Sequence, residues 1–340
     1  MAPRKAMTKA RISRMENLQI KVADGIGAFP AKDAKTSSPY RLQWLSIVDK
    51  EDTGKMFRIN HQNACKKNTD LFLLVLVKSG AGNFKRRQTW RENWGAIKSV
   101  NGREIRVFFV TAMTDDVTSQ YKMEIENVRF GDILQGVFKD NYANNTFKLL
   151  SSFEWANSYC SNAEYVLSVD DDVMVVPARL VTFLTKNNDV NLIGGYIIPA
   201  MVRKLDNNSK WFVNFTNYPY LYYPDYVTGF AVVLSGPLIP RLLKASESLQ
   251  YMFHVDDAYI GLCAFSIDVK PVFISGFELY RLEANLDYSY EKYKSVIAIH
   301  GLNETEKVKL WRHLLVDLDL RLEQRWLPYP HFVMNSSDTI

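Results

Sequence analysis

The stretch Tyr165-Val-Leu-Ser-Val-Asp170-Asp171-Asp172-Val173 is the most informative part of this sequence, because a short apolar run leads directly into three adjacent carboxylates. A run of this kind predicts a buried strand, here over residues 165–169. Three neighbouring carboxylates repel one another, so their position after a buried strand is costly unless a cation neutralises them. Because alternate residues of an extended segment point the same way, Asp170 and Asp172 are expected to share a face.

This acidic stretch predicts a metal site at the end of a strand. In open α/β sheets, ligands bind beyond the carboxyl ends of the strands. Carboxylate and diphosphate oxygens are hard ligands that suit Mn²⁺ or Mg²⁺. The matching chemistry is transfer from a nucleotide diphosphate donor, whose leaving charge the ion stabilises. The alternatives are an exposed acidic turn or a calcium site. The apolar run at 173–176 favours the first interpretation, because it holds the acids between buried elements.

Strands and helices alternate on both sides of the acidic stretch. This alternation predicts an α/β fold with a mostly parallel central sheet flanked by helices. The order of the strands does not follow from their spacing. The expected strands cover residues 71–77, 104–110, 132–138, 165–169, 191–198, 230–234 and 269–274, and the expected helices cover 84–94, 117–130, 146–160, 237–247, 256–265 and 304–318.

Length and composition narrow the class of protein. The 340 residues are 47% hydrophobic and 23% charged, which excludes a disordered chain. The net charge of +5 is too small to indicate a nucleic-acid partner. No apolar stretch approaches the roughly 18 residues of a membrane span. The three cysteines, Cys65, Cys160 and Cys263, allow at most one intramolecular disulfide.

The chain is expected to have three parts. Residues 1–69 show little periodicity and are predicted to be an irregular tail or stem, residues 70–330 a single catalytic domain, and residues 331–340 a C-terminal tail. The first fifteen residues are basic and lack acids, which suits a transit peptide, a short cytosolic tail or a solvated flexible end equally well. No hydrophobic signal segment follows them.

Five Asn-X-Ser/Thr sequons are candidate N-glycosylation sites. Each is weak alone, because the pattern is short and arises by chance. Together they point modestly toward the secretory lumen. They lie at Asn144, Asn207, Asn214, Asn303 and Asn335.

Several blocks between about residues 71 and 311 resemble, in the same order, the β-1,3-galactosyltransferases and β-1,3-N-acetylglucosaminyltransferases of glycosyltransferase family 31. Any one block is a weak signal, and their joint order and spacing carry the resemblance. The blocks are an Arg-rich segment ending in Trp-Gly (84–95), a second block (130–148), the acidic stretch (165–173), a Tyr-Pro-Asp-Tyr block (223–235) and an acidic block (256–261).

The resemblance implies a GT-A-type fold, a UDP-sugar donor, a divalent metal and inversion at the anomeric carbon. By position, Asp172 is the main metal ligand, Asp170 belongs to the same metal site or faces the nucleoside, and Asp171, between them, is a donor contact. His300 stands where the family has a His that completes the metal site. A lone His after an apolar strand is also a common structural residue, and both interpretations stay open.

The resemblance assigns Asp257 as the general base. Inversion in one displacement needs a carboxylate that takes the proton of the acceptor hydroxyl while that hydroxyl attacks opposite the departing UDP. A position near the start of the helix at 256–265 helps to keep the base ionised. The alternative for two acids at a helix start is N-capping. Asp256, on the acceptor side, is expected to serve as the cap while Asp257 acts.

Other candidates are expected around the donor and the acceptor. Arg87 and Arg91, four residues apart on one helix face, are expected to meet the donor phosphates, whereas Lys85 and Arg86 are expected to form a solvated basic face. The remaining candidates carry a competing core-packing interpretation. They are Asp140, Tyr142 and Lys148 on the donor side, and Trp211, Tyr223, Tyr226 and Gly229 on the acceptor side.

The expected function is that of a metal-dependent inverting hexosyltransferase. It moves galactose or N-acetylhexosamine from a UDP-sugar to a hydroxyl of a glycan on a glycoprotein or glycolipid, with a β-1,3 linkage, in the Golgi lumen or membrane. The alternative is a catalytically inactive relative that binds a glycan or a partner. Two departures from the family stand out: Val227 replaces a usual Cys, so Cys160 is expected to lack its partner, and no signal-anchor segment is visible.

Overall fold

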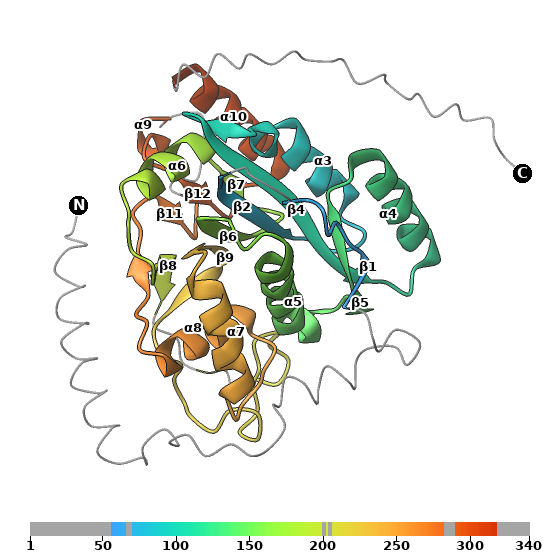
Figure 1. Cartoon of the computed structure of the whole chain (residues 1–340), viewed down its shortest axis with the longest axis vertical. Helices are drawn as coiled ribbons and strands as arrows, with labels where there is room; N and C mark the ends of the chain where they lie inside the picture. Colours follow the sequence, from blue (N-terminus) through green and yellow to red (C-terminus); the bar gives the residue numbers. More distant parts are fainter. Residues whose placement is uncertain (1–55, 66–69, 199–201, 203–205, 282–289, 318–340) are drawn as a thin grey trace, which may run out of the picture.

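The computed structural model describes residues 56–65, 70–198, 202, 206–281 and 290–317. A central sheet is covered by helices on both faces (Figure 1). Helices α5 (Asn145–Tyr159), α7 (Leu238–Ser248) and α8 (Asp256–Ser266) pack on one face. The other face is covered mainly by the helices α3 (Phe84–Glu92), α4 (Val117–Phe130), α6 (Pro177–Thr185) and α10 (Glu304–Asp317).

The described strands form a nine-stranded sheet and a small second sheet. The main order is β1-β5-β4-β2-β6-β9-β8-β10, with β3 paired to β4. The second sheet has the order β11-β12-β7. The strands are β1 (Phe57–Ile59), β2 (Leu71–Lys78), β3 (Ser99–Val100), β4 (Arg103–Met113), β5 (Ile133–Lys139), β6 (Tyr165–Asp170), β7 (Met174–Val175), β8 (Ile193–Ile198), β9 (Tyr226–Ser235), β10 (Val272–Phe273), β11 (Phe277–Glu278) and β12 (Ala298–Ile299).

The predicted α/β class is confirmed, and the main sheet is more mixed than predicted. Strands β5, β4, β2 and β6 run parallel to one another. Strand β9 runs antiparallel to both β6 and β8. A parallel return needs a crossover of a dozen or more residues, usually a helix. The described residues between β8 and β9 hold no helix, so β9 returns in the opposite direction.

Strand β2 shows why the sequence forms this core. Leu71–Val77 is buried throughout, and its side chains divide between the two apolar clusters on either side of the sheet. A strand that is buried on both faces reads as a continuous apolar run. The sequence analysis did not anticipate helix α6, whose start is favoured by Pro177 in its first turn and whose buried side chains include Leu180 and Leu184.

The residues just before β2 belong to the folded domain, contrary to the prediction of an irregular segment up to residue 69. Strand β1 pairs antiparallel with the edge of β5, with Phe57 opposite Gly136. Cys65 forms a disulfide with Cys160, so the expectation that Cys160 lacks a partner is wrong. Cys263 is a buried free thiol. The predicted C-terminal tail, most of the N-terminal segment and Asn335 lie outside the described residues.

No helix among the described residues has the length and apolar character needed to cross a bilayer.

The parallel strands β2 and β6 end side by side, with Lys78 opposite Asp170. The candidate site is therefore at the carboxyl ends of the central strands.

The disulfide provides a test of how firmly β1 is tied to the domain. Replacing Cys65 and Cys160 together by Ser is expected to lower the free energy of unfolding by about 2–4 kcal/mol, because the bond closes a long loop in the unfolded chain. Urea denaturation followed by circular dichroism measures the change. Wild-type protein under reducing conditions is the control and should match the variant; an unchanged unfolding midpoint in both would contradict the pairing.

Candidate active site

Lys78 lies at the centre of the candidate site and joins three elements. Its ammonium Nζ donates to Asp256 Oδ2 on α8 at 2.7 Å and to the carbonyl oxygen of Gly229 on β9 at 3.2 Å. It is also 3.1 Å from Asp170 Oδ1 at the end of β6. The lysine at the end of β2 thus supplies part of the neutralisation that the acidic stretch requires.

Electrostatics keep this cluster ionic. Burial alone lowers the pKa of Lys78, but Asp170 and Asp256 outweigh burial and raise it above its ordinary value. Burial raises the pKa of Asp170 to about 6, even though Lys78 acts in the opposite direction. The sequence analysis missed Lys78, although a lysine that ends an otherwise apolar buried strand was the available signal.

Asp257 is held at the start of α8, next to the Lys78 cluster. Its Oδ2 accepts a hydrogen bond from the Gly229 N–H at 2.8 Å, and its Oδ1 accepts one from the Ala258 N–H at 2.8 Å. A side chain at Gly229 would come within 3.0 Å of the Asp257 Cβ atom, so Gly allows this close approach. Burial and the neighbouring Asp256 raise the pKa of Asp257 to about 6.

The predicted capping role of Asp256 is wrong, whereas the base role of Asp257 stays a prediction. Asp256 does not cap the helix, because its carboxylate is paired with Lys78. Asp257 is the acid that takes an N–H at the helix start. Asp257 is partly exposed.

The Asp171 side chain points toward the loop after β2. It is buried, and its carboxylate accepts hydrogen bonds from Ser79 Oγ at 2.7 Å, Asn83 Nδ2 at 2.8 Å and Arg86 Nη1 at 2.8 Å. These contacts tie the loop after β2 to the end of β6. They argue against the predicted contact with the donor, because the carboxylate oxygens already accept hydrogen bonds from protein side chains.

Asp172 and His300 face each other at the edge of the small second sheet. Strand β12 pairs antiparallel with β7, with Ile299 opposite Met174, so the same register continues to place His300 opposite Val173, next to Asp172. His300 Nε2 lies 3.9 Å from Asp172 Oδ1. The sequence separates these residues by more than a hundred positions, and only the small second sheet brings them together.

The chemistry of this pair fits a divalent cation. His300 Nδ1 lies 3.2 Å from the Leu279 carbonyl oxygen, and such a bond needs the proton on Nδ1, which leaves a lone pair on Nε2. Asp172 Oδ1 is shielded from solvent and has no hydrogen-bond partner among the described residues. No group of three His, Cys, Asp or Glu side chains among the described residues forms a metal cluster.

Arg87 does not reach the acids at the end of β6, which corrects the prediction of a phosphate contact. It is fully buried, and its guanidinium makes two hydrogen bonds to Glu126, at 2.9 and 2.6 Å. It also donates to the carbonyl oxygens of Gly80 and Ala81. Arg87 therefore anchors the loop after β2 to α4.

Arg91 is likewise committed within the protein. It forms a bidentate pair with Asp132 at 2.8 Å and donates to Glu126 at 2.7 Å. Its guanidinium carbon lies 4.7 Å from the centre of the Phe109 ring. The predicted phosphate contact is again replaced by a structural role.

Arg86, which the sequence analysis assigned to a solvated face, is the arginine at the site. Its Nη1 lies 2.8 Å from Asp171 Oδ1 and 3.4 Å from Asp172 Oδ2, and its side chain is 41% exposed. The Arg-rich block contains four basic residues on one short helix. The sequence offers no clear signal for which of them turns toward the acids.

Three donor-side candidates lie close to the same loop. Asp140 accepts from the Ala81 N–H at 2.9 Å and from Lys148 Nζ at 2.6 Å, and Lys148 also donates to the Ser79 carbonyl oxygen. Both side chains are nearly buried, so they support the loop instead of contacting a ligand. Tyr142 is more exposed. Its partial burial and the charges of the two acids of α8 raise the pKa of its hydroxyl.

The acceptor-side aromatics divide into two groups. Tyr223 and Tyr226 are buried, and the ring of Tyr223 stacks on Phe253 at 5.2 Å, which agrees with the core-packing alternative. Trp211 is 47% exposed and has Lys210 Nζ 4.7 Å from a ring centre. Of these three side chains, Trp211 is the exposed one.

The candidate glycosylation sites also differ in accessibility. Asn144 donates its side-chain amide to the Lys139 carbonyl oxygen, and the sequon's Thr146 is buried, so this sequon is poorly placed for a glycan. Asn207, Asn214 and Asn303 are exposed.

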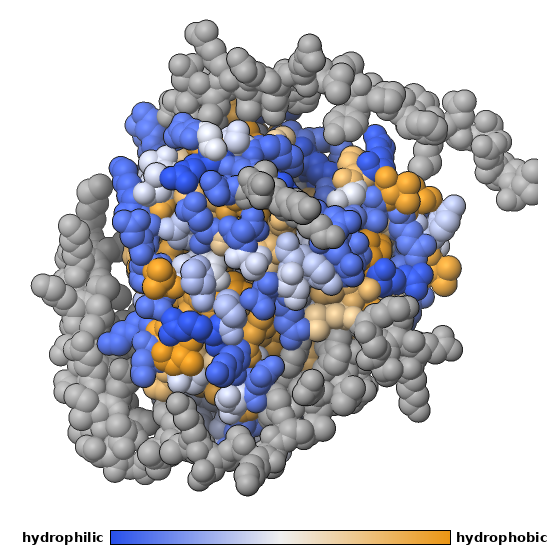
Figure 2. Space-filling model, viewed as in Figure 1, coloured by the Kyte–Doolittle hydropathy of each residue, from blue (hydrophilic) through white to orange (hydrophobic). Residues whose placement is uncertain are grey.

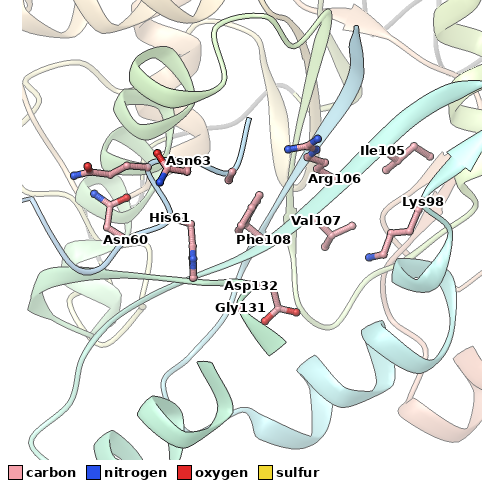
Figure 3. Close-up of a pocket in the computed structure, with 12 residues that line it drawn as sticks. Asn60, His61, Asn63, Lys98, Ile105, Arg106, Val107, Phe108, Gly131 and Asp132 are labelled. Carbon is pink, nitrogen blue, oxygen red and sulfur yellow. The ribbon is translucent and has the colours of Figure 1, made fainter. Parts of the chain in front are cut away.

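A separate cavity of about 490 Å³ lies at the other end of β4 (Figure 3). His61 and Phe108 lie at one end of it and Lys98 at the other. It borders the part of β4 that precedes the pairing with β5, which begins at Phe109. None of its lining residues belongs to the Lys78 cluster or to the Asp172–His300 pair.

The chain is similar to known glycosyltransferases over most of its length. Residues 85–274 match the model of the galactosyltransferase family. The chain is 33% identical over 283 residues to lactosylceramide 1,3-N-acetyl-beta-D-glucosaminyltransferase B of Danio rerio, covering 78% of this chain and 72% of the relative. It is 30% identical over 292 residues to UDP-GalNAc:beta-1,3-N-acetylgalactosaminyltransferase 1 of Mus musculus, covering 81% and 84%. A solved apo structure of the bifunctional glycosyltransferase WbbM matches 74% of this chain and 51% of its own chain, with a TM-score of 0.41 and 11% identity.

The neighbouring arginines Arg86 and Arg87 provide a matched pair of variants. Arg87→Ala is expected to lower the free energy of unfolding by about 3–5 kcal/mol, because it leaves the Glu126 charge buried without this partner. Arg86→Ala removes a half-exposed side chain and is expected to cost much less stability while weakening the binding of UDP. Urea denaturation and calorimetric titration with UDP measure the two effects; the reverse pattern would show that Arg87 faces the ligand after all.

Proposed function

We propose, from the premise that this chain belongs to the galactosyltransferase family, that it transfers galactose or an N-acetylhexosamine from a UDP-sugar to a glycan hydroxyl with a β-1,3 linkage. The observation that supports the proposal is the position of Lys78 between two acidic segments. Lys78 connects the end of β6, which leads into Asp172, to the start of α8, which carries Asp257. The proposed leaving-group site and the proposed base thus belong to two segments that one buried cation joins.

The names of the relatives narrow the expected substrates. One relative is named for transferring N-acetylglucosamine to lactosylceramide, and another for the donor UDP-GalNAc. Both names describe a β-1,3 transfer of an N-acetylhexosamine. We therefore favour an N-acetylhexosamine over galactose for the donor sugar, and a glycan carried on lipid over one carried on protein for the acceptor. The Golgi lumen or membrane is the proposed location.

Asp257 is proposed to act as the general base. Its two hydrogen bonds to the N–H groups of Gly229 and Ala258 fix the carboxylate and leave it able to accept a proton. Taking the proton from the acceptor hydroxyl lets that oxygen attack the anomeric carbon opposite the departing UDP, which inverts the configuration. Asp256 is paired with Lys78, whereas the described partners of the Asp257 carboxylate are these two N–H groups.

Asp172 and His300 are proposed to hold Mn²⁺ or Mg²⁺ together with the donor diphosphate, with Asp170 beside them. The unpaired Asp172 Oδ1 and the free Nε2 of His300 support this assignment. The bound ion would offset the negative charge that develops on the diphosphate. Arg86 is positioned to add a second positive charge at the same place.

Asp257→Asn is expected to reduce transfer by at least about a thousandfold and to leave UDP binding nearly unchanged, because the amide cannot accept the hydroxyl proton. Transfer is measured with the UDP-sugars UDP-GlcNAc, UDP-GalNAc and UDP-Gal against lactose-terminated acceptors, and UDP binding by calorimetry.

The pH profile is the control for this assignment. The base acts only when deprotonated, so kcat/KM should be low below pH 6 and should rise as the pH passes the Asp257 pKa of about 6. Normal turnover by the Asn variant, or an acid limb that it shares with the wild type, would show that another group takes the proton.

Asp172→Ala is expected to abolish the dependence of UDP binding on added Mn²⁺, because the variant lacks the unpaired carboxylate oxygen. Titration of UDP with and without Mn²⁺, and with EDTA, measures the effect. Asp189→Ala, which removes an exposed acid remote from the site, is the matched control. Equal Mn²⁺ dependence in Asp172→Ala and wild type would place the metal elsewhere.

A further inference from the structure

Helix α10 carries a fully buried lysine. Lys307 is 0% exposed, and its ammonium Nζ donates to the main-chain carbonyl oxygen of Asp172 at 3.0 Å. It also donates to Glu304 Oε1, three residues earlier on the helix, at 2.5 Å. A lysine is almost never fully buried unless it is paired, because its charge loses its hydration. These two contacts therefore offset a burial that would otherwise be costly.

The pattern of α10 predicts an apolar side chain at this position. The buried side chains of the helix follow the three- and four-residue spacing of one face, and they are Lys307, Leu310, Trp311 and Leu314. Trp311 packs edge-to-face on Trp94, and α10 lies beside α3 in Figure 1. A charged residue within such an apolar stripe breaks the local rule, and departures of this kind are expected mainly at functional sites.

The outer face of α10 offers exposed positions for charged residues. Lys309, Arg312 and His313 occupy such positions. The described surface at this end of the domain, around α6 and α3, is mostly hydrophilic in Figure 2. The contact with Asp172 is thus the feature that distinguishes the buried Lys307 from the exposed lysine two residues later.

Lys307 contacts its acid differently from the other two cations of the site. Lys78 and Arg86 each lie within 3.1 Å of a carboxylate oxygen of the acidic stretch. Lys307 donates instead to the main-chain carbonyl of Asp172. The Asp172 Oδ1 atom has no hydrogen-bond partner among the described residues and lies 3.9 Å from His300 Nε2. A cation on the carbonyl fixes the main chain and leaves this carboxylate oxygen available.

We propose that Lys307 is a positioning residue of the metal and donor site, which fixes the main chain at Asp172 so that its carboxylate meets the ion in one geometry. The inference rests on the proposed function, because it needs Asp172 to be a metal ligand. Glu304 keeps the ammonium in place from the same helix. Groups that orient a metal ligand without touching the metal typically change the affinity by about 10- to 100-fold.

Lys307→Met tests the proposal, because it removes the ammonium and keeps a side chain of similar length. It is expected to weaken the binding of Mn²⁺ in the presence of UDP by at least about tenfold, since the Asp172 main chain loses its donor. Electron paramagnetic resonance of free Mn²⁺ during a titration measures the affinity. Lys309→Met removes an exposed lysine from the same helix and should bind Mn²⁺ like the wild type.

Lys307→Arg separates positioning from packing. Arginine keeps a charged donor but has a bulkier head, so this variant should bind Mn²⁺ more tightly than Lys307→Met. A role in packing alone predicts the opposite order, because Met suits the apolar stripe better. Thermal unfolding followed by circular dichroism shows which variants are folded. If Lys307→Met does not fold, a folded Lys307→Arg protein that has lost Mn²⁺ binding overturns the proposal, and one that retains it supports the proposal.

Asp172→Ala distinguishes the failure of this inference from the failure of the proposed function. Wild-type Mn²⁺ affinity in Lys307→Met, together with its loss in Asp172→Ala, would overturn the role of Lys307 and leave the proposed metal site intact. Wild-type affinity in both variants would remove the metal site at Asp172 and the positioning role with it.

Discussion

The ammonium of Lys78 is the interaction on which the site depends. It is buried between Asp170 and Asp256 and also donates to the Gly229 carbonyl, so one charge joins β2, β6, β9 and α8. Without it, the acids at the end of β6 and the start of α8 would repel one another across a space shielded from water. The distance between the acidic stretch after β6 and the start of α8 is therefore set by a protein cation.

Many charged residues near the site form hydrogen bonds that hold the loop after β2, instead of pointing toward a ligand. Arg87 and Glu126 hold that loop against α4, and Asp171 and Asp140 accept hydrogen bonds from its residues Ser79 and Ala81. Buried ion pairs are expensive to break from one side, so such a loop is stiff. A stiff loop keeps the few groups that remain available, above all Asp172, in a defined place.

The order of elements was predictable because it follows from local pattern. Strand β2 is a continuous apolar run, and α4 extends over the predicted 117–130. The direction of β9 and the pairing of β1 were not predictable, because each depends on which strand edge is left open once the rest has folded. Val227, in place of a cysteine, suggested that Cys160 lacked a partner, whereas Cys65 arrives from a segment with no strong pattern of its own.

By itself the sequence determined that an apolar strand ends in acids, that a second acidic pair starts a helix, and that both belong to a nucleotide-sugar transferase pattern. Only the tertiary structure decided which charge faces which. A helix turns by about 100° per residue, so Arg86 and Arg87 point in different directions, one to the acids of β6 and the other into the core. Likewise, His300 reaches Asp172 through the pairing of two short strands far apart in the chain, and no local pattern records that contact.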